Sequence, residues 1–302
     1  MAYQLQSGET ISEGLKRILR EETDLIIRLL TQGDDLHRSV HETRKACKRI
    51  RAVWRLVRDQ VGHKAYRREN ATYRDASRDL SRLRDLSALL ETLDQLEHLP
   101  LSSQTRTVWE RARQDLEALR DQAEAAFSQD ILAEVAERVS VAQVRIEKLT
   151  LKTERFKAIE KGFHRVYRRS HRGLRHSQKK TDAERMHDWR KRVKYLRFHV
   201  QLMQPIWPTM MEAFGSELHR LSDYLGDHHD LAVLSEFLQD QVIITEPIAG
   251  KDEFMALLEA QQMTLAQHSF ELGERLFLNR PADFVFEVRQ YWELWRQHQL
   301  VA

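Results

Sequence analysis

Two segments of this chain, 146 residues apart, repeat one pattern of cationic and apolar residues. The recurring cations are His41, Arg44, Lys45, Lys48 and Arg51 in the first copy, and His187, Arg190, Lys191, Lys194 and Arg197 in the second. At 100° per residue these positions share one side of an α-helix, whereas apolar residues such as Ile50 and Val193 occupy the other. The pattern therefore predicts an internal duplication, with one amphipathic basic helix in each half.

The matching register extends beyond the two basic segments. Residues 80–86 align with 225–231 at an offset of 145, and residues 12–18 align with 160–166 at an offset of 148. With only ten Gly and five Pro in 302 residues, the composition favours helix throughout. Hydrophobic periodicity predicts helices at about 10–31, 36–60, 64–95, 104–126, 128–139, 153–176, 183–204, 209–241, 252–277 and 283–299. We expect an all-α protein.

A third predicted helix carries another row of cations. Lys161, Arg165, Arg168, Arg169 and Arg172 share one face, and Arg55 extends the face of the first basic helix. Segments 41–58, 186–203 and 155–180 carry +6, +4 and +9, so the remaining residues sum to −16 within a formal net charge of +3. Like charges one turn apart repel. The rows therefore indicate either a solvated charged surface or, as we expect for the repeated pair, a site for an anionic ligand.

Other sequence features indicate where in the cell we expect this protein. The first residues are polar and show no signal-peptide pattern, and no stretch approaches the roughly 20 apolar residues that span a bilayer. The single cysteine, Cys47, falls on the apolar side of its helix, where a buried thiol is expected. We expect a cytoplasmic protein with no membrane partner, and we leave its oligomeric state open.

The doubled motif resembles the CHAD domain, the conserved histidine α-helical domain family. The resemblance covers about residues 9 to 300. It rests on Val40-His41-x-x-Arg44-Lys45-x-x-Lys48-x-x-Arg51, on Met186-His187-x-x-Arg190-Lys191-x-x-Lys194-x-Leu196-Arg197, and on Leu225-Gly226-x-x-x-Asp230.

This resemblance implies two bundles of about four main helices each, 1–145 and 146–302, related by a pseudo-twofold axis. Their basic helices would face a central cavity that binds inorganic polyphosphate. We also expect such a protein to be recruited to polyphosphate granules. By position, the ten cations of the doubled motif would line that cavity, with Arg17 and Arg165 as secondary candidates. Tyr195 stands where the first copy has Arg49, and Gln201 where it has Arg55, so we expect an asymmetric cavity.

Basic helices suit a flexible polyanion, because cations one turn apart offer many simultaneous contacts to closely spaced phosphates. We expect strongly salt-dependent binding, tightened at acidic pH if the two motif histidines become charged. The main alternative is a nucleic acid, but Trp54 and Tyr167 fall on apolar faces, where they cannot stack on bases. Phe198 alone intrudes on a basic face.

Enzymatic activity is the other alternative. The sequence has no Gly-rich phosphate loop, no His-Glu-x-x-His and no nucleophile elbow, so we expect a protein that is not an enzyme and needs no cofactor. Asp227-His228-His229-Asp230 could suggest a metal near Asp230, but on a helix only Asp227 and Asp230 of this segment could converge. We expect these residues to begin a helix and cap it instead.

Overall fold

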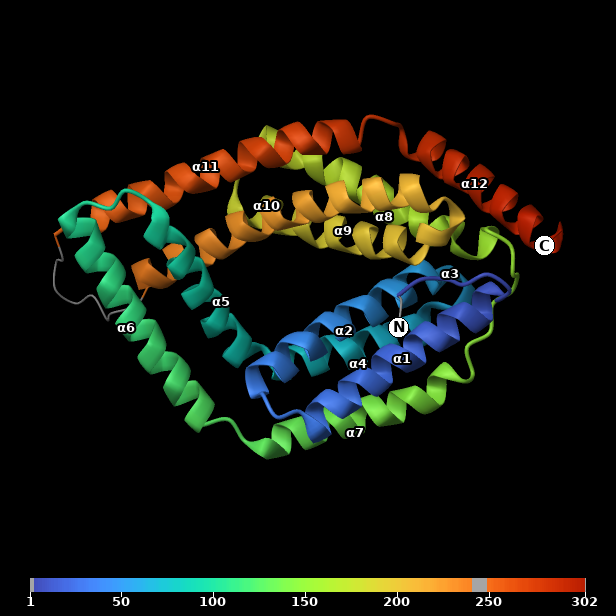
Figure 1. The fold of residues 1–302 in the computed structure, drawn as a ribbon, viewed down its shortest axis with the longest axis horizontal. Helices are drawn as coiled ribbons and strands as arrows, with labels where there is room; N and C mark the ends of the chain where they lie inside the picture. Colours follow the sequence, from blue (N-terminus) through green and yellow to red (C-terminus); the bar gives the residue numbers. More distant parts are fainter. Residues whose placement is uncertain (1–2, 241–248, 302) are drawn as a thin grey trace.

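The computed structural model describes residues 3–240 and 249–301, and these fold into helices joined by short connections (Figure 1). The helices of the first half are α1 (Ile11–Gln32), α2 (Leu36–Leu56), α3 (Arg58–Val61), α4 (His63–Asp79), α5 (Ser81–Gln95), η1 (Leu96–His98), α6 (Ser103–Ala125) and α7 (Gln129–Ile146). Those of the second half are α8 (Lys157–Lys179), α9 (Ala183–Leu202), η2 (Gln204–Ile206), α10 (Pro208–Asp240), α11 (Lys251–Leu276) and α12 (Pro281–Val301). The all-α fold class is confirmed.

Two groups of helices face each other in Figure 1. In the lower group, α1 packs on α2 and α7, and α4 packs on α2 and α7. In the upper group, α9 lies between α8 and α10, while α11 packs along α10 and α12 along α8. The basic helices α2 and α9 contact each other between the groups. The pseudo-twofold relation between the two halves stays a prediction.

The two basic helices begin at equivalent polar caps. The side chain of Asp35 accepts a hydrogen bond from the backbone N–H of Arg38 at 3.0 Å, and Asp182 accepts one from Arg185 at 2.9 Å. Such caps satisfy N–H groups that have no partner within the helix. Each cap therefore starts its helix about one turn before the motif histidine.

The apolar faces of the helices form two cores. The larger core joins both halves, with Ile50 and Val53 of α2 and Val193 and Leu196 of α9 fully buried in it. The smaller one lies where α5 and α6 meet α10 and α11, around Leu93, Leu116, Leu234 and Phe254. This smaller core also combines elements of both halves, so the halves are packed together at two places.

A close contact joins the halves at the C-terminal ends of α2 and α9. The buried imidazole of His199 donates from Nε2 to the carbonyl oxygen of Ala52 at 2.9 Å, and Leu5 N–H donates to Leu202 O at 3.0 Å. Gly162 of α8 lies against the backbone of Leu56, where a Cβ atom would come within 1.9 Å of the Leu56 carbonyl oxygen. The absence of a side chain at Gly162 thus lets α8 lie directly on the end of α2.

Most predicted helices agree with the structure to within a few residues, but four predictions were wrong. The segment 128–139 is too short, because α7 runs on to Ile146. The segment 64–95 is two helices, because α4 ends at Asp79 and α5 begins at Ser81. The segment 36–60 breaks at Val57. Asp227 to Asp230 lie inside α10 rather than at a helix start, since α10 already runs from Pro208. None of the helices in the described part of the chain holds a segment long and apolar enough to span a membrane.

Candidate anion-binding site

Lys48 of α2 and Lys194 of α9 bring the two repeated helices together in one partly buried, basic environment. Burial, together with repulsion from Arg44, Arg190 and Arg84, lowers the pKa of Lys48 to about 8. Burial, together with repulsion from Arg190 and Lys48, lowers the pKa of Lys194 to about 7. Of the groups facing these lysines, Asp230 is the acid that favours their charged forms. The lysines are therefore destabilised as cations, and a nearby anion would stabilise them.

Two arginines flank this lysine pair, and each has an acidic partner on a following helix. Arg44 approaches Asp85 of α5 at 3.3 Å and donates to the backbone oxygen of Ser77 at 2.7 Å. Arg190 approaches Asp230 of α10 at 3.7 Å. These contacts hold each arginine in place and use only some of its N–H donors. The buried Nε of Arg190 has no hydrogen-bond partner among the described residues.

Gly226 of the third motif segment lies against the side chain of Arg190. A Cβ atom at Gly226 would lie 3.4 Å from a terminal nitrogen of Arg190 and 3.6 Å from its Nε. Both distances are ordinary van der Waals contacts. The third motif segment on α10 is thus in direct reach of the second basic helix.

The motif histidines lie at the edges of the site and are neutral near pH 7. The ring of His187 lies 4.0 Å from that of His229 of α10, measured between centroids. Burial, followed by repulsion from Lys191 and Arg190, lowers the pKa of His187 to about 4. The pKa of His41 is also lowered, by burial and then by the charge of Arg84. Charging of the His187 ring therefore requires a pH well below the usual range of histidine, and both rings are harder to charge than a free imidazole.

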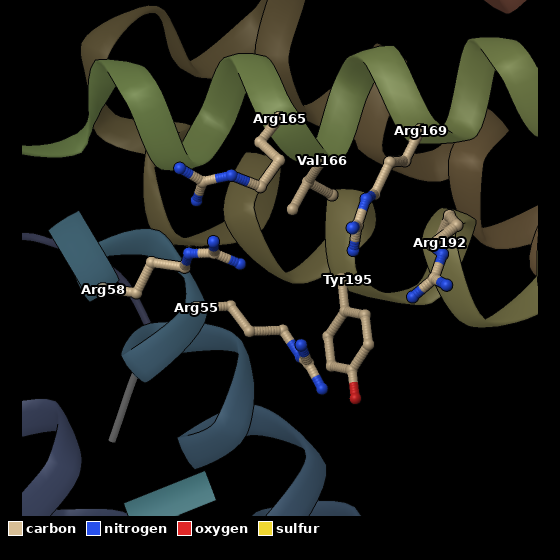
Figure 2. A pocket seen from close by; sticks show the side chains of 7 residues that line it. All are labelled: Arg55, Arg58, Arg165, Val166, Arg169, Arg192 and Tyr195. Carbon is tan, nitrogen blue, oxygen red and sulfur yellow. The ribbon is translucent and has the colours of Figure 1, made fainter. Parts of the chain in front are cut away.

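A second basic feature is a pocket between α2, α8 and α9, which we call the arginine pocket. Its lining residues are Arg55, Arg58, Arg165, Val166, Arg169, Arg192 and Tyr195, and Figure 2 shows arginine side chains extending into it from both α8 and the end of α2. Arg55 lies over the Tyr195 ring, with its guanidinium carbon 4.3 Å from the ring centroid. Burial lowers the pKa of Arg169, and the charges of Arg192, Arg58, Arg165 and Arg55 add to the effect. The pocket therefore holds more positive charge than its neighbouring acidic side chains neutralise.

A larger, more open pocket of about 400 Å³ lies between α2, α9 and α10. Lys45, Arg49 and Arg197 line it together with uncharged residues such as Gln201 and Gln204. Arg197 lies over the Phe198 ring at 5.1 Å and contacts Nδ1 of His219 at 2.9 Å. The two pockets differ in charge, because Gln201 and Gln204 occupy the positions that Arg55 and Arg58 hold in the first copy.

The remaining predicted residues are not all gathered at one place. Lys45 and Lys191 are exposed and pair with Glu42 and Asp188 on their own helices. Arg51 contacts the Asn70 side chain at 3.3 Å. Lys161 and Arg168 are exposed on α8, and Arg172 lines a separate surface pocket with Arg175, His176, Gln178 and Lys179.

Arg17 is placed differently from the other candidates. Its Nε lies 2.5 Å from Glu9, a terminal nitrogen lies 3.4 Å from Glu21, and another donates to the Gln4 backbone oxygen. The hydrogen bond to Glu9 is the main reason why the pKa of Arg17 is raised. The structure thus shows Arg17 binding the N-terminal segment to α1, and does not bring it into the lysine pair or the arginine pocket.

Several residues of the site were not among the predicted candidates. Arg192 belongs to neither basic stripe, yet it lines the arginine pocket because α9 packs beside α8. Arg84 and His229 occupy matching positions in the two halves and lie beside His41 and His187, respectively. The signal for Arg84 and His229 was present, since both fall within the aligned segments 80–86 and 225–231. Arg192 had no such signal.

The acidic residues of the Asp227–Asp230 segment lie inside α10 in different surroundings. Within residues 3–240 and 249–301, no three His, Cys, Asp or Glu side chains are grouped so that they could hold an ion. Burial raises the pKa of Asp227, and repulsion from Asp230 raises it further. Asp230 instead faces Arg190.

Comparisons with known proteins agree with this arrangement. The family model described as the CHAD domain matches residues 9–239. The crystal structure of the CHAD domain from the plant Ricinus communis is similar with a TM-score of 0.63 and 18% sequence identity, covering 93% of this chain and 96% of that one. No curated protein matches the sequence. The match to the family model spans well over half of the residues, and the chain belongs to the CHAD domain family.

Proposed function

We propose that this protein binds inorganic polyphosphate between α2, α8 and α9 and does not hydrolyse it. The observation that carries the proposal is the pair of partly buried lysines, Lys48 and Lys194, which come from the two repeated helices and repel each other. Asp85 and Asp230 hold the neighbouring Arg44 and Arg190 in place beside these lysines. A phosphate chain supplies many negative charges in a small volume, and so would relieve this repulsion.

Nucleic acid is less well supported than polyphosphate. Single-strand binders use exposed aromatic rings on which bases stack. The aromatic residues of α2 and α9 are Trp54, Trp189, Tyr195 and Phe198. Trp54, Trp189 and Phe198 are buried, and Arg55 covers the ring of Tyr195. The surface therefore offers cations without stacking platforms, which suits a ligand that has phosphates and no bases.

A binding series separates the candidate functions. The protein is titrated with long-chain polyphosphate, tRNA and duplex DNA from low to high salt, and phosphate release is assayed with and without divalent metal. We expect the tightest binding to polyphosphate at every salt concentration, a steep loss of affinity with salt, and no phosphate release. Equal affinity for the three polymers would contradict specific polyphosphate binding, and metal-dependent release would indicate an enzyme.

The affinity for polyphosphate is expected to fall as the pH rises from 7 to 9. Lys194 and Lys48, with pKa values of about 7 and 8 in the free protein, lose charge over this range, whereas a bound polyanion favours their protonated forms. Each linked proton lowers affinity by up to about tenfold per pH unit. Between pH 5 and 7 His187 adds little, since its pKa is lowered to about 4. Calorimetry in buffers of different ionisation enthalpy measures the proton uptake, and pH-independent affinity would contradict this assignment.

We further propose that the protein acts in the cytoplasm and associates with polyphosphate granules there. This follows from the proposed ligand and from the motif resemblance, and imaging of a fluorescent fusion beside a polyphosphate stain tests it. Diffuse fluorescence in granule-containing cells would contradict the association.

A further inference from the structure

The arginine pocket differs from the rest of the basic surface in size and in the number of guanidinium groups around it. Five arginines from α2, α3, α8 and α9 surround a cavity of about 20 Å³, whereas the pocket on the α10 side measures about 400 Å³. A cavity of roughly 10–15 Å³ on the same measure accommodates one water molecule. The arginine pocket therefore has room for one small group and not for a run of linked phosphates.

The pocket carries positive charge that the described side chains only partly neutralise. Asp59 lies 2.6 Å from a terminal nitrogen of Arg165. Arg55 donates to two neutral groups, Tyr66 at 2.7 Å and Asn70 at 3.1 Å. In addition, Nε of Arg55 and Nη1 of Arg165 are buried without a hydrogen-bond partner among the described residues. A small group with several acceptor oxygens and more than one negative charge would neutralise the remaining positive charge of the pocket.

We propose that the arginine pocket binds the terminal phosphate of a polyphosphate chain, an inference that rests on the proposed function. A terminal phosphate has three non-bridging oxygens and carries close to two negative charges at neutral pH, whereas an internal one has two such oxygens and a single charge. The terminal group also needs space on one side only, where its chain leaves the pocket. Five guanidinium groups around a small cavity match the terminal group better than the internal one.

The corresponding place in the second copy does not repeat these features. Gln201 and Gln204 replace Arg55 and Arg58, and the pocket that they line is larger and includes the acidic Glu212. Only the α8 side therefore combines small size with dense charge in the described structure. A chain bound to the lysine pair would be oriented, with one end in the arginine pocket and the remainder along α2 and α9.

The test compares long-chain polyphosphate with free ends against the same chains capped at both ends as phosphoramidates. Capping removes terminal charge but changes the total charge of a long chain very little. We expect the wild type to bind uncapped chains about tenfold more tightly, which is the scale of one charge-assisted hydrogen bond. The variant R58Q/R169Q should lose this preference and bind capped and uncapped chains with the same, reduced affinity. Both arginines lie outside the hydrogen bonds that join α2 to α4, so the fold should persist.

The control variant R120Q/R220Q removes the same charge from a half-buried position on α6 and an exposed one on α10, and should retain the preference for free ends. Equal binding of capped and uncapped chains by the wild type would overturn the inference and leave the proposed function intact. Absence of binding to either would overturn both. Pyrophosphate and orthophosphate form a third arm. If they bind at one additional equivalent on top of a saturating uncapped chain, the pocket serves a separate small anion, and the chain-end assignment is wrong.

Discussion

Replacing Lys48 and Lys194 together with methionine is expected to reduce polyphosphate affinity by at least about a hundredfold while raising the stability of the free protein. Binding falls because two cations between the repeated helices are lost. Stability rises because methionine matches the length of the lysine stem and removes two charges that burial disfavours. For groups that remain partly exposed, we expect a gain of about 1–2 kcal/mol for the pair.

The sign of the stability change follows from the lowered pKa values. Both lysines hold a proton less tightly in the folded protein than in the unfolded chain, so the cost of charging them is fully present below about pH 7 and disappears above the unfolded value of 10.5. The gain in melting temperature should therefore be largest at pH 6.5 and smaller at pH 9.5. Thermal unfolding at both pH values, with a binding isotherm at each, measures the two effects.

The matched control is K16M/K148M, which removes two charges from α1 and from the connection after α7. This variant should lose little affinity, and its melting temperature should not depend on pH in the same way. Neutralisation is preferable to charge reversal here, because a glutamate at Arg44 or Arg190 would face Asp85 or Asp230. Wild-type affinity in K48M/K194M would show that the anion binds elsewhere.

The substitution G162A is expected to destabilise the protein by about 2–3 kcal/mol. A Cβ atom would lie 1.9 Å from the Leu56 carbonyl oxygen and 2.7 Å from the Leu56 Cα, so α8 must move away from α2. Since Arg165 and Arg169 follow Gly162 by one and two turns, the movement would also separate them from Arg55 and Arg58. We therefore expect the preference for chain ends to weaken.

The control is G215A, within α10. There the nearest atom to an added Cβ is Cγ1 of Val200 at 3.6 Å, which is an ordinary contact. Because alanine is favoured over glycine in a helix interior, G215A should stabilise the protein by about 0.5–1 kcal/mol. Chemical denaturation of both variants measures the difference. A neutral G162A would mean that the approach of α8 to α2 can relax without cost.

The local patterns of the chain predicted its helices well, and the exceptions have physical reasons. Periodicity alone could not place the break at Leu80, because α4 and α5 both continue the apolar repeat while packing against different partners. The Asp227–Asp230 segment looks like a cap, since aspartate often precedes a helix. It lies inside α10 because the helical periodicity continues through 209–241, and the tertiary structure adds only that Asp230 faces Arg190.

The sequence by itself determined which side chains share a helical face, because the 3.6-residue period is a property of the backbone, and the repeat identified Lys48 and Lys194 as equivalent. Tertiary structure alone decided which faces meet. It brought Arg192 beside α8 and turned Arg17 toward Glu9, and it buried Lys48 and Lys194 among arginines that lower the pKa of both. Those outcomes depend on how closely the helices approach one another. Contacts such as that of Gly162 with Leu56 set this distance, and they join residues more than a hundred positions apart in the chain.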